Sequence, residues 1–75
     1  MYLHVGNNYV VRMDEIIGIF DIRNKRTNIY RFFLKPKLQM DNVIDLTESF
    51  PPSSCVVTKD KIILSGISSK TLQKR

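Results

Sequence analysis

The sequence predicts an α+β fold: a small antiparallel β-sheet with one central helix and a short C-terminal helix, in a single domain over residues 1–75. Two observations predict these elements. Short β-branched and aromatic runs alternate with turn residues, and one central segment carries apolar residues at helical spacing. A third observation bounds the domain count, because 75 residues provide room for one hydrophobic core.

Residues 2–21 predict three strands. Residues 2–5 and 9–12 are β-prone, and the intervening Gly6-Asn7-Asn8 contains residue types that tolerate positive φ, which favours a hairpin. Met13-Asp14 predicts a corner. Residues 16–21 follow as a third strand, because this β-branched run is too short to favour a helix.

Residues 24–35 predict the central helix. Asn24 or Thr27 is suited to cap its start by accepting a hydrogen bond from an exposed backbone N–H. Pro36 lacks an N–H group and is expected to end or kink the helix. An apolar stripe at core spacing is formed by Ile29, Phe32 and Phe33, while Tyr30 lies off it and is expected to be more exposed.

The second half of the chain predicts a short strand, a hairpin and a helix. Residues 42–46 predict the strand, and Pro51-Pro52 marks the loop that follows. Residues 55–58 and 61–65 flank a Lys59-Asp60 turn and predict the hairpin. Ser68 or Ser69 then caps a basic helix over residues 70–75.

Two arguments predict association between copies. The single cysteine and single histidine exclude an internal disulfide and a Cys/His metal cluster, so a small core is left to be supported by partner subunits or by unusually good packing. The strand runs 16–20, 56–57 and 62–64 are continuously apolar, which suggests that both sheet faces are covered. The helices are expected to cover one face and a neighbouring subunit the other.

The net charge of +5 is unevenly distributed. Residues 22–40 contain six basic residues and residues 61–75 contain four, and neither stretch contains an acid. If the two stretches share a face, they form a patch suited to phosphate. The alternative is a solvated basic surface with no specific partner.

The sequence carries no catalytic motif, so we expect neither enzymatic activity nor a cofactor or small-molecule substrate. His4 lies at a strand end without a nucleophile at motif spacing, and Cys55 begins a strand that is expected to be buried. The glycines form no phosphate loop. We expect a cytoplasmic protein without membrane contact, because the thiol is single, no signal segment is evident, and no apolar run approaches the roughly 20 residues that span a bilayer.

Two segments resemble the RemA/RemB family of bacterial extracellular-matrix regulators, and the RemB branch most. The first comprises residues 1–6, Val10-Val11 and Ile16-Ile17-Gly18-Ile19-Phe20-Asp21. The second comprises Pro52-Ser53-Ser54, Val56-Val57-Thr58, residues 61–65 and residues 67–75. The resemblance implies a small α+β subunit that assembles into a homo-oligomeric ring and binds double-stranded DNA on its outside.

The chain departs from this family at positions that matter for DNA. RemA-type members have arginine where this chain has Glu15, and paired arginines in the loop that here contains Phe50-Pro51-Pro52-Ser53. If the chain binds DNA, other cations must contact the phosphates. The candidates are Arg23, Lys25, Arg26, Arg31, Lys70, Lys74 and Arg75.

Two functions follow as hypotheses. The first is a ring-forming, DNA-binding transcriptional regulator of the RemA/RemB type, which holds phosphates through basic side chains. The second is a protein-interaction adaptor that joins related regulator subunits without touching DNA; the missing RemA-type arginines motivate it.

Overall fold

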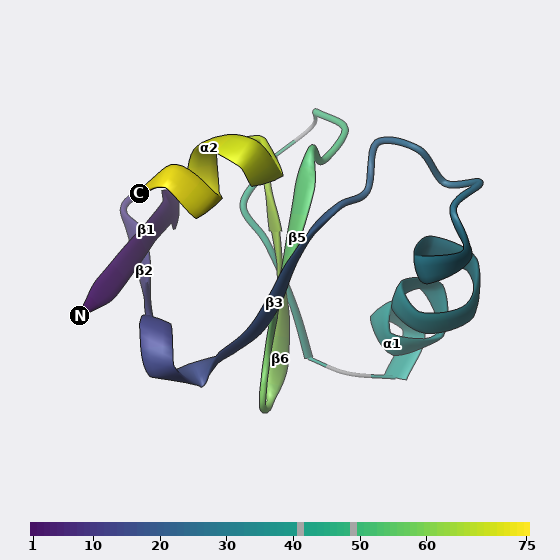
Figure 1. Cartoon of the computed structure of the whole chain (residues 1–75), viewed down its shortest axis with the longest axis horizontal. Coiled ribbons are helices and arrows are strands. Elements are labelled where there is room, and N and C mark those ends of the chain that lie inside the picture. Colours follow the sequence, from purple (N-terminus) through teal and green to yellow (C-terminus); the bar gives the residue numbers. More distant parts are fainter. Residues whose placement is uncertain (41, 49) are drawn as a thin grey trace.

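Three layers make up the computed structural model, which describes residues 1–40, 42–48 and 50–75. The middle layer is a four-stranded sheet in the order β3-β5-β6-β4, a second sheet consists of the β1-β2 hairpin, and helices complete the chain. The hairpin and the C-terminal helix α2 lie on one side of the large sheet, and the central helix lies on the other (Figure 1). The predicted α+β class is confirmed.

The N-terminal hairpin forms as its sequence predicts. Strands β1 (Tyr2–Gly6) and β2 (Tyr9–Arg12) pair antiparallel. Asn7 and Asn8 both have positive φ, 50° and 62°, in the left-handed conformation that a tight two-residue hairpin turn requires. The predicted corner is a single 3₁₀ turn, η1 (Met13–Glu15).

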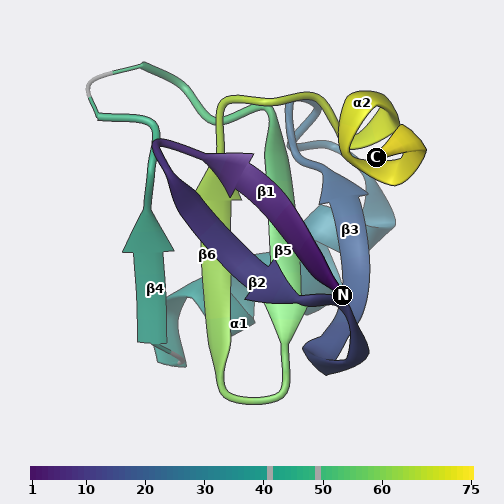
Figure 2. The same ribbon diagram turned by 90° about the vertical axis from the view of Figure 1, so that its left-hand side faces the viewer.

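The large sheet contains one parallel pair within an otherwise antiparallel arrangement. Strand β3 (Ile16–Asp21) pairs antiparallel with β5 (Ser54–Thr58), which pairs antiparallel with β6 (Lys61–Ser65). Strand β4 (Asn42–Asp45) runs parallel to β6. The prediction of a wholly antiparallel sheet was wrong here, because the chain after β4 crosses the end of β6 before it turns down into β5 (Figure 2).

Of the two predicted caps of the central helix, the structure uses Thr27, and the helix continues past Pro36 to Met40. Thr27 is its cap, with Oγ1 accepting from the Tyr30 N–H at 3.2 Å, whereas Asn24 Oδ1 accepts from the Arg26 N–H at 3.0 Å in the preceding turn. A π-helical turn, η2 (Tyr30–Leu34), leads into α1 (Lys35–Met40). Pro36 therefore lies within the helix, in the first turn of α1, where its missing N–H is tolerated after the widened turn.

The helix presents a different face to the sheet from the one its sequence suggests. Ile29, Phe32 and Phe33 are exposed, whereas Leu34 is completely buried, with Tyr30 and Leu38 packed beside it. The expectations for the apolar stripe and for Tyr30 were therefore wrong. Tyr30, Leu34 and Leu38 are spaced four apart, as neighbours on one helix face are, and they pack toward the sheet together.

Both faces of the large sheet are covered by the chain itself. One core joins the hairpin and α2 to the sheet, and its buried members are Leu3, Val5, Val11, Val56, Ile63 and Leu72. The other joins the helix to the sheet, and its buried members are Ile22, Leu34, Cys55, Val57 and Ile62. The expectation that a neighbouring subunit covers one face was wrong, because the hairpin folds back across the sheet (Figure 2).

Candidate functional site

The two basic stretches lie in different outer layers of the molecule. The cations of residues 22–37 surround the central helix and the loop before it, while Lys70, Lys74 and Arg75 lie on or beside α2 (Ser69–Lys74). Figure 1 shows α2 and the central helix on opposite sides of the sheet. One chain therefore does not combine all seven predicted site residues in a single patch.

A shallow hollow of about 570 Å³ gathers the cations of the helix layer. Four of its five lining side chains are cationic and the fifth is a phenol; they are Lys25, Arg26, Tyr30, Arg31 and Lys35. The residues around it in sequence, 22–40, include no acid. This arrangement concentrates positive charge at one place and is suited to an anion that offers several oxygens, such as phosphate.

Local hydrogen bonds hold the backbone that carries the hollow. The Asn24 side chain accepts from the Arg26 N–H, and Thr27 caps the first helical turn through the Tyr30 N–H. The Arg31 N–H donates to the Thr27 carbonyl at 3.0 Å, which continues the helix. The Lys25-Arg26 turn is therefore fixed next to the helix that carries the other lining residues.

Two of the predicted site residues are engaged within the chain. The guanidinium of Arg23 donates from Nε and Nη2 to the two carboxylate oxygens of Asp21, at 3.1 and 2.8 Å. These hydrogen bonds lower the pKa of Asp21 to about 2. Arg75 donates to the backbone carbonyl of His4 at 2.8 Å. Both arginines are less available to a ligand than those of the hollow.

Sequence reasoning missed two members of the hollow, Lys35 and Tyr30. Lys35 was counted among the basic residues of 22–40 but not among the candidates for DNA contact, and Tyr30 was placed off the apolar stripe without a binding role. The sequence did contain a signal for Lys35. It lies four residues after Arg31, and residues at this spacing are neighbours on one helix face.

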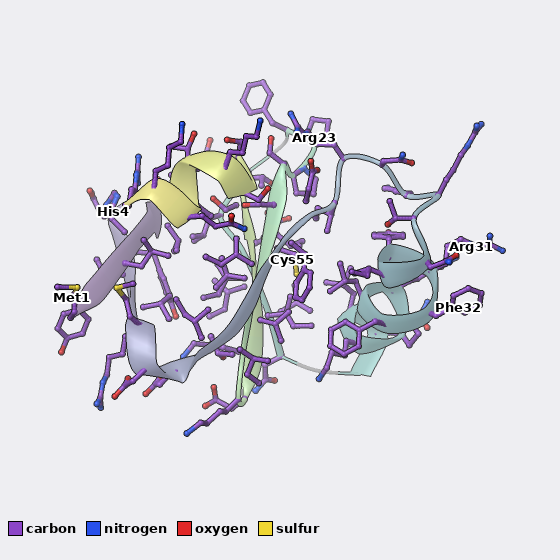
Figure 3. The ribbon with its side chains drawn as sticks, viewed as in Figure 1. Met1, His4, Arg23, Arg31, Phe32 and Cys55 are labelled. Atoms are coloured by element: carbon purple, nitrogen blue, oxygen red, sulfur yellow. The ribbon has the colours of Figure 1, made fainter. Side chains whose placement is uncertain are left out.

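The groups that could support catalysis do not gather. His4 is exposed on the hairpin, whereas Cys55 is fully buried in the sheet (Figure 3). The predicted burial of Cys55 is confirmed. Burial raises the pKa of the Cys55 thiol to about 11, which favours the unreactive protonated form. Among the described residues, no three His, Cys, Asp or Glu side chains are placed to share a metal ion. No described helix has the length and apolar character needed to cross a membrane.

Comparison with known proteins decides the family. A family model described as RemA-like, extracellular matrix regulatory protein A-like, matches residues 2–75. The chain belongs to the RemA-like family. It is 40% identical over 75 residues to extracellular matrix regulatory protein B of Bacillus subtilis (strain 168), an alignment that covers 100% of this chain and 89% of that protein. The predicted likeness to the RemB branch of the family is confirmed.

The structure shows what occupies the positions where RemA-type members were expected to carry arginine. Glu15 ends the η1 turn and is partly buried. In the loop before β5, Phe50 is exposed, while the Ser53 N–H donates to the Ser65 carbonyl at 2.9 Å. This RemA-like chain thus places its basic hollow on the helix layer, away from η1.

Proposed function

We propose that this RemA-like chain is a cytoplasmic regulator of extracellular-matrix genes that assembles into a ring and binds double-stranded DNA through its phosphates. The observation that carries the proposal is the hollow lined by four cations and one phenol. Lysine and arginine side chains at such a site neutralise phosphates and release bound counterions, which provides affinity without reading sequence.

A single subunit offers few phosphate contacts, so assembly is part of the proposal. Copies that present the hollow repeatedly along one DNA molecule would bind it with avidity. The outer face of the hairpin is the candidate contact between copies. Tyr2 and Val10 are exposed there, Met1 and Met13 are exposed at its open end, and the Met13 N–H donates to the Met1 carbonyl at 3.0 Å. Exposed apolar residues gathered on one hairpin in this way favour association.

The test compares two double variants that change the charge equally. K25E/R26E alters the hollow and K70E/K74E alters α2, and each lowers the net charge from +5 by four, to +1. We expect K25E/R26E to lose at least about tenfold in affinity for promoter DNA at low salt. We also expect a salt slope lower by about two than that of the unmodified protein.

Electrophoretic mobility shifts and anisotropy titrations over a range of salt concentrations measure these effects. K70E/K74E should lose clearly less affinity. Equal losses in the two variants would show that net charge, not the hollow, governs binding. Failure of the unmodified protein to retard any bacterial promoter DNA at low salt would reject the proposal.

A second candidate function is an adaptor that binds related regulator subunits without DNA. The observation that favours it is the replacement of the RemA-type arginines by Glu15 and the loop containing Phe50. Pull-down from lysate separates the two functions: nuclease treatment should release partners bridged by DNA and leave a direct protein partner bound.

A further inference from the structure

Two phenylalanine rings stand open to solvent beside the cationic hollow. Phe32 is 72% exposed and Phe33 is 41% exposed. Figure 3 shows Phe32 pointing outward from the helix, next to Arg31. The inward side of the helix is filled by other residues, since Leu34, Leu38 and Tyr30 make its contacts with the sheet. The Phe32 ring is therefore surplus to the packing of the helix on the sheet, whereas the partly exposed Phe33 ring packs against Phe20 of β3, with the two ring centroids 5.9 Å apart.

Arg31 links these rings to the hollow. Its guanidinium carbon lies 5.4 Å from the centroid of the Phe32 ring, and the same side chain lines the hollow. The Lys37 ammonium lies 5.7 Å from the Phe33 centroid. Cations thus stand beside each ring, close enough for cation–π attraction. Through Arg31, the exposed Phe32 ring and the cations of the hollow form one surface.

The chemistry of this surface favours one class of ligand. The cations favour a polyanionic ligand, because residues 22–40 contain no acid and four basic side chains line the hollow. The exposed aromatic ring favours a ligand with flat groups that can stack on it. A duplex offers phosphates but keeps its base faces stacked inside the helix, whereas a single strand offers phosphates and free base faces together.

We propose that this surface binds single-stranded nucleic acid, with phosphates in the hollow and an unpaired base stacked on Phe32. The proposal rests on the proposed function for its phosphate site and adds the ligand class: a strand whose bases are open, as in a melted segment of DNA. Binding is tolerant of sequence, because every base has a face that can stack.

The test compares a labelled oligothymidine with a duplex of the same length, in anisotropy titrations at fixed salt. We expect F32A to lose about fivefold or more in affinity for the single strand and to keep its affinity for the duplex within about twofold. F32W should retain single-strand binding, because it preserves an aromatic face, and F32L should behave like F32A.

The matched control is F50A, because Phe50 is also 72% exposed but lies in the loop before β5. F50A should bind the single strand like the unmodified protein. Both side chains are exposed, so neither change is expected to disturb folding, which far-UV circular dichroism checks.

The outcomes separate this inference from the proposed function. Unchanged single-strand affinity in F32A, with duplex binding still sensitive to K25E/R26E, overturns the inference and leaves the proposed function standing. If the unmodified protein binds neither the single strand nor the duplex, both the inference and the proposed function are rejected. F32A could instead lower the assembled mass in light scattering while each subunit keeps its affinity for the single strand. The Phe32 side chain would then contact a second copy of the chain, and the inference would be overturned.

Discussion

The helix layer and the hairpin layer are attached to the same sheet by different means. On the hairpin side, Ser65 Oγ donates to the Val5 carbonyl at 2.7 Å, and Arg75 donates to the His4 carbonyl at 2.8 Å. These bonds join residues 60 and 71 positions apart in sequence. On the helix side, Leu34, Leu38 and Tyr30 pack on the sheet through apolar groups. The Phe33 ring adds an aromatic contact with Phe20 of β3.

The two layers therefore use their cationic side chains differently: one stabilises the fold, and the other leaves them accessible to a ligand. The terminal arginine of the hairpin layer, Arg75, is used to fix β1, while the hollow of the helix layer gathers its cations around open space. Among the described residues, the helix layer packs on the sheet mainly through apolar and aromatic side chains, and we expect it to open more easily than the hairpin layer with its long-range hydrogen bonds. The comparison teaches that the binding surface and the less firmly attached layer coincide.

The largest expected effect on stability comes from truncating a buried leucine in either core. Leu34→Ala on the helix side and Leu72→Ala on the hairpin side each remove a side chain that is 0% or 1% exposed. Each should lower the free energy of unfolding by about 2–5 kcal/mol, because the cavity adds to the lost transfer energy. Urea unfolding followed by circular dichroism measures this. If Leu34→Ala left the midpoint unchanged, the helix would not be part of the cooperative unit.

The next effect uses Cys55 as a reporter of the helix layer. Because burial raises its pKa from 9.0 to about 11, the folded thiol stays protonated at pH 8.5 and should react with alkylating reagents only through opening. Val56 is the adjacent residue and belongs to the hairpin-side core, so C55A/V56C moves the reporter across the sheet. We expect the native thiol to react faster. Equal rates would mean that both layers open together.

The same thiol predicts a dependence of stability on pH. Above pH 9 the unfolded chain loses the thiol proton while the folded chain retains it, so the unfolded state binds fewer protons and stability falls as the pH rises. The fall should run from about pH 9 to about pH 11 and should be absent in C55A, as urea unfolding at a series of pH values would measure.

A smaller effect distinguishes the caps of the two helices. Thr27→Ala removes the acceptor for the Tyr30 N–H, and Ser68→Ala removes the acceptor for the Thr71 N–H at 3.2 Å. Each should cost about 1 kcal/mol of stability. Only Thr27→Ala should also weaken DNA binding, because it frays the turn that carries the hollow. Equal binding by both variants would mean that the hollow does not depend on this cap.

The smallest expected effect comes from releasing Arg23. Asp21→Asn removes the carboxylate that holds the guanidinium and should raise DNA affinity by about twofold, since exposed ion pairs contribute little. The pKa of Asp21 is depressed to about 2, so the native pair should persist as the pH falls past 3.8 and be lost only near pH 2. Anisotropy titrations of D21N beside R23Q measure the effect; a gain in R23Q would contradict it.

Local sequence patterns predicted most of the elements. The two asparagines of the first turn, the hairpin around Lys59-Asp60 and the Ser68 cap are each decided by residues close together in the chain, and all three are confirmed. The predicted basic residues around Lys25 and Arg26 do line the hollow. These features depend on side chains and backbone within a few residues of each other.

The sequence by itself determined where charge is concentrated, which segments form strands, and that Cys55 is buried, because composition and short-range spacing carry that information. Only the tertiary structure decided that β4 runs parallel to β6, that the hairpin covers the second sheet face, and that Phe32 faces solvent while Leu34 faces the core. The physical reason is that a π turn changes the phase of the helix, and a loop crossing sets strand direction. Both outcomes depend on packing between segments that lie far apart in the chain.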